Sequence, residues 1–277
     1  MESDQSIKFL FRALVTQIYR RLLGSLYLHV PLIDRIFAPI INRGPYRIRL
    51  SRSRFAVVLY RHPKLVREDE QFLQHFLKPG MTYVDVGANI GTTTLMGAHA
   101  VGSEGEVVAF EPHPRTFDDL QKSVALNQAL APRIRLIQSA LGDEDGETHL
   151  SDLLENDVNH IVAGGIAVPI TTLDEAVRDI PHIDLLKVDV EGYEKNVFLG
   201  ATDTLARTDA VYFESSESNF EQFGYSADDV FDILSARGFS IYTVDRTDFS
   251  LREAPRGRRC LDGYENLLAL STPSAGD

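Results

Sequence analysis

Short apolar segments alternate with amphipathic segments along most of the chain after residue 66. Seven segments rich in β-branched and aromatic residues have the length of buried strands: 82–86, 106–110, 134–138, 184–189, 210–214, 239–244 and 266–270. Helical stretches are predicted at 67–77, 92–100, 114–128, 194–206 and 227–236. Buried strands with helices between them predict an α/β fold, with a mostly parallel seven-stranded sheet and helices on both faces. The last two strands have no helix between them, so we expect them to form an antiparallel pair at an edge.

Two regions depart from this alternation. Residues 147–172 hold two short β-like runs around Gly164 and Gly165, which predicts a hairpin inserted before the fourth strand. The N-terminal region predicts a helix over residues 7–28, followed by short strands at 46–50 and 55–60. We therefore divide the chain into an N-terminal helical and short-strand extension, residues 1–66, and a main domain, residues 67–277.

The N-terminal helix has an apolar stripe on a basic background. Residues 1–43 hold six Lys or Arg against three Asp or Glu. The uncharged stretch at residues 22–33 is shorter than the ~20 residues that a membrane span needs, and the acidic start does not suit a secretory signal. The helix could lie on an anionic membrane surface or on a partner protein. We favour packing within the protein itself, because most amphipathic helices pack in that way.

Composition narrows the possible functions. The chain carries 40 acidic and 28 basic residues, a formal charge of −12, so no overall positive field favours nucleic acid and we expect no nucleic-acid partner. Cys260 is the single cysteine, which excludes an intrachain disulfide framework and a multi-cysteine zinc site. We expect a cytoplasmic protein, with peripheral membrane contact as the alternative. The sequence does not indicate the oligomeric state.

A glycine-containing turn follows the first strand of the main domain. Residues 85–91 read Asp-Val-Gly-Ala-Asn-Ile-Gly and lead directly into a helix. Gly87 and Gly91 allow close approach of a ligand to the backbone, and the open amides at the start of the helix attract an electronegative group. Asn89 stands where a dinucleotide fingerprint has its second glycine, which disfavours NAD.

A carboxylate ends the next strand, 20 positions after Gly91. Glu111 at this place can accept hydrogen bonds from two ribose hydroxyls. Together, the glycine turn and Glu111 indicate an adenosine group bound without a pyrophosphate. S-adenosylmethionine has that chemistry, so we expect it as the cofactor.

Four segments then resemble successive motifs of the FkbM family of methyltransferases: residues 85–91, the Phe-Glu-Pro-x-Pro run at 110–114, Ala-Leu-Gly-Asp at 140–143, and Lys-x-Asp-x-Glu-Gly-x-Glu at 187–194. The resemblance spans about residues 67–215 and implies a class I methyltransferase Rossmann-like fold. It implies that Asp85, Gly87, Asn89 and Gly91 contact the methionine part of the cofactor and that Glu111 binds the ribose. It also implies that Ser139, Ala140 and Asp143 lie near the adenine.

The fourth motif carries the candidate catalytic residues. In an open parallel sheet the ligand crevice lies beyond the carboxyl ends of the strands, so Asp189 and Glu191 should border the transferred methyl group. Either carboxylate could orient an acceptor hydroxyl or take its proton. We expect Lys187 to pair with one of these acids and Glu194 to stabilise the following helix. Glu214, after the fifth strand, could join them around Mg²⁺, but no ligand spacing supports this and we expect no metal site.

The sequence therefore predicts an S-adenosylmethionine-dependent O-methyltransferase. As the family resemblance implies, its partner would be a small-molecule or glycan acceptor whose hydroxyl group is methylated. One alternative is an NAD-dependent oxidoreductase, and Asn89 argues against it. Another is a non-catalytic nucleotide-binding protein of the same fold, against which the intact acidic motif argues weakly.

Overall fold

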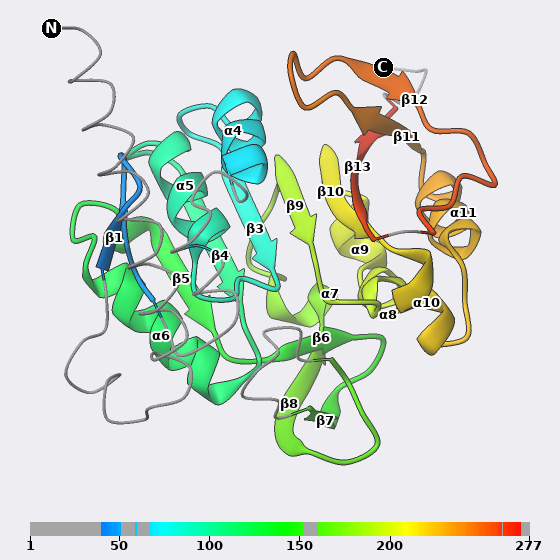
Figure 1. Ribbon diagram of the computed structural model, residues 1–277, viewed down its shortest axis with the longest axis horizontal. Helices are drawn as coiled ribbons and strands as arrows, with labels where there is room; N and C mark the ends of the chain where they lie inside the picture. The colour runs from blue at the N-terminus through cyan, green and yellow to red at the C-terminus, as the bar shows by residue number, and fades with distance from the viewer. Residues whose placement is uncertain (1–39, 51–58, 60–66, 152–159, 262, 273–277) are drawn as a thin grey trace, which may run out of the picture.

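The computed structural model describes residues 40–50, 59, 67–151, 160–261 and 263–272 of the chain (Figure 1). The helix expected at residues 7–28 lies outside these residues. Apart from Leu59, so does the strand expected at residues 55–60. Of the N-terminal extension, the structure describes two short antiparallel strands, β1 (Ile40–Asn42) and β2 (Arg47–Arg49).

The main sheet has a parallel half that follows the predicted alternation. Its strands are β3 (Thr82–Val86), β4 (Glu106–Phe110), β5 (Ile134–Ile137), β9 (Leu185–Val188) and β10 (Ala210–Ser215). The helices before and between the first of them are α4 (Arg67–Phe76), α5 (Thr92–Ala100) and α6 (Pro114–Ala125), with the short 3₁₀ turn η1 (Ala131–Arg133) before β5. All neighbouring pairs in this half are parallel, so their carboxyl ends lie along the same edge of the sheet.

The other half of the sheet is antiparallel. Strand β13 (Glu265–Ser271) lies between β10 and β11 (Phe239–Val244) and is antiparallel to both. The pairing of the last two predicted strands is therefore confirmed, but β13 is internal and does not form an edge. An eighth strand, β12 (Leu251–Glu253), forms the edge instead; its side chains are exposed, so it has no apolar pattern to mark it. The full order is β12-β11-β13-β10-β9-β3-β4-β5.

A second, smaller sheet follows β5. The predicted hairpin is formed by β7 (Gly146–Leu150) and β8 (Ile166–Thr172), which pair antiparallel. Strand β6 (Ala140–Gly142) pairs parallel with β8, so the third motif is part of this sheet. Figure 1 shows the small sheet below the main one.

The remaining helices connect the second half of the fold. They are α7 (Leu173–Ala176), α8 (Glu194–Leu199), α9 (Thr202–Leu205), α10 (Glu217–Gln222) and α11 (Ala227–Ala236). The single helix predicted at 194–206 is two short helices. At the break, a Cβ on Gly200 would lie 1.9 Å from the carbonyl oxygen of Gly142, so the chain passes too close to the small sheet for any other residue.

Alternate residues of one strand enter two different cores. Val84 of β3 belongs to a buried cluster with Val197 of α8 and Leu234 of α11, whereas Tyr83 belongs to a second cluster with Leu95 of α5. Helices therefore cover both faces of the sheet, as predicted. The second cluster also contains Tyr46, Ile48 and Leu50, so the described part of the N-terminal extension packs into the core of the main domain. Within the described residues, no helix is both long and apolar enough to cross a bilayer.

Candidate active site

The glycine turn after β3 lies against the fourth motif. Gly87 has φ +83°, and a Cβ there would lie 1.8 Å from the carbonyl oxygen of Asp189. Asn89 also has a positive φ, of 50°, and Gly91, with φ 98°, precedes α5 without a side-chain cap. The two motifs are more than 90 residues apart in the sequence, and glycine at position 87 permits their contact. The uncapped start of α5 leaves backbone amides facing the turn.

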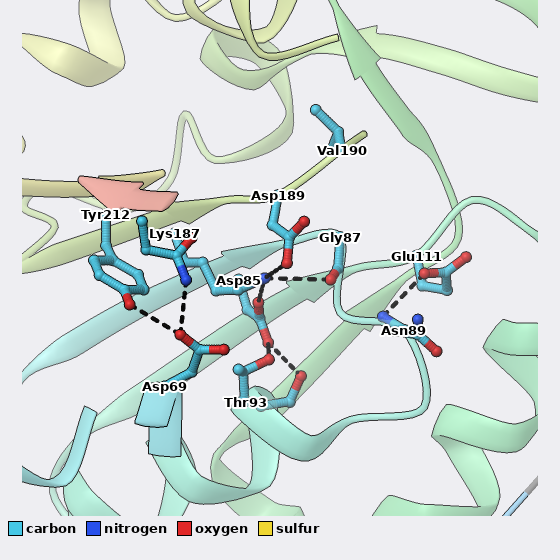
Figure 2. A network of polar contacts seen from close by, with 12 residues as sticks. Asp69, Asp85, Gly87, Asn89, Thr93, Glu111, Lys187, Asp189, Val190 and Tyr212 are labelled. Atoms are coloured by element: carbon cyan, nitrogen blue, oxygen red, sulfur yellow. Dashed lines mark hydrogen bonds and ion pairs between the residues drawn. The ribbon is translucent and has the colours of Figure 1, made fainter. Parts of the chain in front are cut away.

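Glu111 closes the turn from the neighbouring strand. Its Oε2 accepts a hydrogen bond from the amide of Asn89 at 3.0 Å (Figure 2). Its Oε1 accepts one from the amide of His113 at 2.9 Å. Burial raises the pKa of Glu111 to about 7, although the two amides act in the opposite direction. Each carboxylate oxygen can accept a further bond, so the group fits two ribose hydroxyls.

His113 is buried and forms the N-cap of α6. Its ring Nδ1 faces the amide of Thr116 at 3.5 Å. This placement gives His113 a structural role at the start of a helix.

Lys187 joins the first and fourth motifs electrostatically. Its Nζ lies 3.2 Å from Oδ2 of Asp189, 3.4 Å from Oδ1 of Asp85 and 3.4 Å from the carbonyl oxygen of Gly87. Burial lowers the pKa of Lys187, but the carboxylates of Asp189 and Asp85 outweigh that effect and the pKa lies above its ordinary value. The predicted pairing of Lys187 with an acid is confirmed, and two acids share it. Figure 2 shows the ammonium between the two carboxylates.

Asp85 is fixed from the other side by α5. Its Oδ2 accepts hydrogen bonds from the hydroxyls of Thr93 at 2.9 Å and Thr94 at 2.6 Å. Asp85 is fully buried, so its carboxylate holds the turn through Lys187 and the two threonines, and its contact with the cofactor stays a prediction. The sequence analysis did not identify the two threonines, although a run of three threonines in the first turn of a buried helix was a usable signal.

Three further acids surround Asp189. The carboxylate of Glu191 accepts a hydrogen bond from Nδ2 of Asn219 at 3.2 Å, and oxygens of Asp189, Glu191 and Glu214 all lie within 4.8 Å of one another. Burial, followed by the charge of Asp189, raises the pKa of both Glu191 and Glu214. Glu194 is fully buried and its Oε1 accepts from the amide of Val190 at 3.0 Å, so it closes the loop before α8, as expected of a structural residue.

The residues expected near the adenine follow β5. Glu111 donates its amide to the carbonyl oxygen of Ile137 in β5, and Ser139 and Ala140 come two and three residues later and are buried. Asp143 lies farther along, beyond β6, where its Oδ1 accepts from Nδ2 of Asn196 in α8 at 3.2 Å. The contact of Ser139, Ala140 and Asp143 with the adenine stays a prediction.

A polar group outside the predicted motifs lies on the other side of Lys187. Asp69 of α4 accepts hydrogen bonds at its Oδ1 from the hydroxyl of Tyr212 and from Nδ2 of Asn266, each at 2.9 Å. Figure 2 shows Asp69 and Tyr212 on one side of the ammonium and Glu111 on the other. The sequence analysis missed this group, because an Asp in a first helical turn is ordinarily a helix-stabilising residue.

Asp69, Tyr212 and Asn266 line a cavity of about 200 Å³, together with Phe72 and Tyr264. Burial raises the pKa of Tyr264, and so do the charges of Asp69, Glu214 and Asp189, in that order. The cavity at Tyr264 therefore lies near the carboxylates of Glu214 and Asp189. Glu111 and this cavity lie on opposite sides of Lys187.

Comparison with known proteins agrees with this geometry. The family model described as the methyltransferase FkbM domain matches residues 85–241, which is more than half of the chain. The chain belongs to the FkbM methyltransferase family. It therefore contains a methyltransferase domain, and the glycine turn and Glu111 fit S-adenosylmethionine as the methyl donor.

Curated relatives include other methyltransferases. Hexuronic acid methyltransferase AglP of Haloferax volcanii is 32% identical over 134 residues, covering 47% of this FkbM methyltransferase and 54% of AglP. 2-O-methyltransferase NoeI of Sinorhizobium fredii is 25% identical over 186 residues, covering 59% and 74% of the two chains. The match to AglP spans about half of its length. Among solved structures, a SAM-dependent O-methyltransferase from Thermotoga maritima aligns with a TM-score of 0.45 at 15% identity, covering 88% of this chain and 83% of the other.

Proposed function

We propose that this chain transfers a methyl group from S-adenosylmethionine to a hydroxyl group of a small molecule or a sugar-containing metabolite. The position of Asp189 carries the proposal. Its backbone touches the Gly87 turn and its carboxylate pairs with Lys187. Its side chain is 36% exposed, so an acceptor can reach the carboxylate.

The bound cofactor supplies an electrophilic methyl group on a positively charged sulfur. Glu111 holds the ribose, and Gly87 lets the backbone approach the methionine part. Asp189 would accept a hydrogen bond from the acceptor hydroxyl, which aligns the oxygen with the methyl carbon. It would take the proton as the carbon–oxygen bond forms and the carbon–sulfur bond breaks, which releases S-adenosylhomocysteine. Lys187 donates to Asp189 at 3.2 Å and keeps its carboxylate in one direction.

We further propose that the acceptor occupies the cavity beside Asp189. The cavity combines the rings of Phe72 and Tyr264 with the polar groups of Asp69 and Asn266. Apolar faces with a few directed polar groups are typical of small-molecule sites, and carboxylate and amide groups bind hydroxyls well. AglP is named for a hexuronic acid, which agrees with a sugar acceptor, and NoeI is named as a 2-O-methyltransferase, which agrees with transfer to oxygen.

A direct test uses the full chain, S-adenosylmethionine and a panel of hydroxylated acceptors that includes free sugars, glycosides and uronic acids. We expect at least one acceptor to gain the mass of one methyl group, with an equal amount of S-adenosylhomocysteine. Asp189→Asn should lose this turnover, and Asp209→Asn, at the opposite end of the sheet beside His182, should keep it. Binding of S-adenosylhomocysteine without turnover of any acceptor would instead favour a non-catalytic binding protein.

A further inference from the structure

Three carboxylates from two neighbouring strands meet in the crevice. Asp189 and Glu191 follow β9, and Glu214 lies near the end of β10, which pairs with β9. One oxygen from each lies within 4.8 Å of the other two. Carboxylate oxygens at this separation can bind one small, hard cation.

Glu214 provides the second observation. Its side chain is more than nine-tenths buried, with 8% exposed. Among the residues that the structure describes, none donates a hydrogen bond to its carboxylate or forms an ion pair with it, although it points toward Asp189 and Glu191. By contrast, Asp189 pairs with Lys187 and Glu191 accepts from Asn219. A carboxylate on a largely buried residue with no donor is a favourable ligand for a cation, because the cation would offset the cost of its partial desolvation.

The single positive charge of Lys187 does not neutralise the three carboxylates. Its ammonium lies 3.2 Å from Asp189 and 3.4 Å from Asp85, so two carboxylates already share it. In the part of the chain that the structure describes, the like charges of Asp189 and Glu191 therefore face Glu214 without a cation of the protein between them.

We propose that Asp189, Glu191 and Glu214 bind a divalent cation of the Mg²⁺ or Mn²⁺ type. Three carboxylate oxygens leave coordination positions for water and for an acceptor oxygen, and Mg²⁺ in proteins usually keeps several of its waters. The partial exposure of Asp189 and Glu191 gives the cation a path from solvent. The site lies in the crevice of the proposed methyl transfer, but cation binding does not depend on that reaction. The sequence has no ligand-spaced motif here, because the third carboxylate comes from a different strand.

A second group of His and Asp residues supplies the control. His182, Asp184 and Asp209 also have ligand atoms within 4.8 Å of one another. There, however, Asp184 accepts from the amide of Thr82 at 2.7 Å, and Asp209 lies 3.1 Å from the ring of His182. His182 and Asp209 are exposed, so no buried carboxylate lacks a partner in this second group.

The test measures Mn²⁺ binding to the chelator-treated full chain, by calorimetry and by the loss of the free Mn²⁺ electron paramagnetic resonance signal, without cofactor or acceptor. We expect one saturable site per chain from which Mg²⁺ displaces Mn²⁺. Glu214→Gln should weaken Mn²⁺ binding at least tenfold while S-adenosylhomocysteine affinity stays within a few fold. Asp209→Asn should bind Mn²⁺ as the unmodified chain does. If Glu214→Gln does not fold, Glu191→Gln, which removes a more exposed ligand, serves in its place.

Two results would overturn the proposal: no saturable Mn²⁺ binding by the unmodified chain, or a site that survives Glu214→Gln and is lost in Asp209→Asn. These results are separate from the proposed function. If the unmodified chain has no Mn²⁺ site and still transfers methyl groups in the presence of a chelator, the cation proposal is wrong and the methyltransferase proposal stands. Mn²⁺ binding that depends on Glu214, without methylation of any acceptor, would support the cation site and count against the hydroxyl acceptor.

Discussion

The affinity for the cofactor should depend on the ionisation of Glu111. Its carboxyl is buried, and its pKa of about 7 means that near neutral pH about half of the free protein carries it protonated. Ribose hydroxyls donate hydrogen bonds to the ionised form, so protonation competes with cofactor binding. We expect the Kd for S-adenosylhomocysteine to be about tenfold higher at pH 6 than at pH 8, since only about a tenth of the groups are ionised one pH unit below the pKa.

Glu111→Gln should remove this dependence. A hydrogen bond to a charged group contributes about 1.5–3 kcal/mol, so the variant should bind S-adenosylhomocysteine about 10- to 150-fold more weakly at pH 8. Its affinity should then be nearly flat between pH 6 and pH 8. The matched control is Glu106→Gln, at the exposed start of the same strand, which should behave as the unmodified chain does.

The same group affects the stability of the cofactor-free protein, with the opposite dependence on pH. The folded pKa of Glu111, about 7, lies above the ordinary value of 4.5, so the folded state keeps a proton that the unfolded chain has released. The stabilising effect is complete below pH 4.5 and is lost as the pH rises toward 7, by about 3 kcal/mol at about 1.4 kcal/mol per pH unit. Denaturant unfolding with and without Glu111→Gln measures this loss.

Isothermal calorimetry of S-adenosylhomocysteine binding at pH 6, 7 and 8 tests whether the ionisation of Glu111 controls the affinity. An affinity of the unmodified chain that does not change with pH would mean that Glu111 is ionised throughout. An affinity of Glu111→Gln equal to that of the unmodified chain, in a variant that unfolds normally, would mean that the ribose is held elsewhere.

Three further substitutions test the site. Asp189→Asn should lower kcat by about 10²–10⁴, the usual contribution of a general base, with S-adenosylhomocysteine affinity within a few fold; unchanged turnover would refute the assigned role. Gly87→Ala should abolish cofactor binding, because its Cβ would lie 1.8 Å from a carbonyl oxygen, whereas Gly80→Ala, with a similar φ and open space, should only lower stability slightly, as binding and thermal unfolding would show. Lys187→Met should destabilise the fold by about 3–5 kcal/mol in denaturant unfolding, because it leaves buried Asp85 without its counter-charge; a loss below 1 kcal/mol would contradict that account.

Most of the fold could be predicted from local pattern. The strands β3, β4 and β11 and the helices α5 and α11 have the predicted bounds, because each is a short apolar or amphipathic run between clear breaks. The internal position of β13 could not be predicted, since strand order depends on which edges meet in three dimensions. The break at Gly200 depends on contact with Gly142, about 60 residues away.

Some residues of the candidate site could also be predicted from local sequence, and others could not. The glycine turn and Glu111 are marked by their spacing within one strand, turn and strand unit, and the structure joins them through the bond from Asn89 to Glu111. The group around Asp69 and the approach of Glu214 to Asp189 have no local signal. Both arise because separate elements end at the same edge of the sheet.

The central claim is the transfer of a methyl group to a hydroxyl oxygen at Asp189, and isotope labelling tests it most directly. The full chain and Asp189→Asn are each incubated with ¹³C-methyl S-adenosylmethionine and a sugar acceptor, and the labelled product is analysed by heteronuclear correlation. The account predicts a labelled methyl group correlated with a sugar ring position that carries a hydroxyl, formed by the unmodified chain and at least 100-fold more slowly by Asp189→Asn, in line with the contribution of a general base. A labelled methyl on a carboxylate, nitrogen or carbon atom, or equal rates for the two proteins, would contradict it.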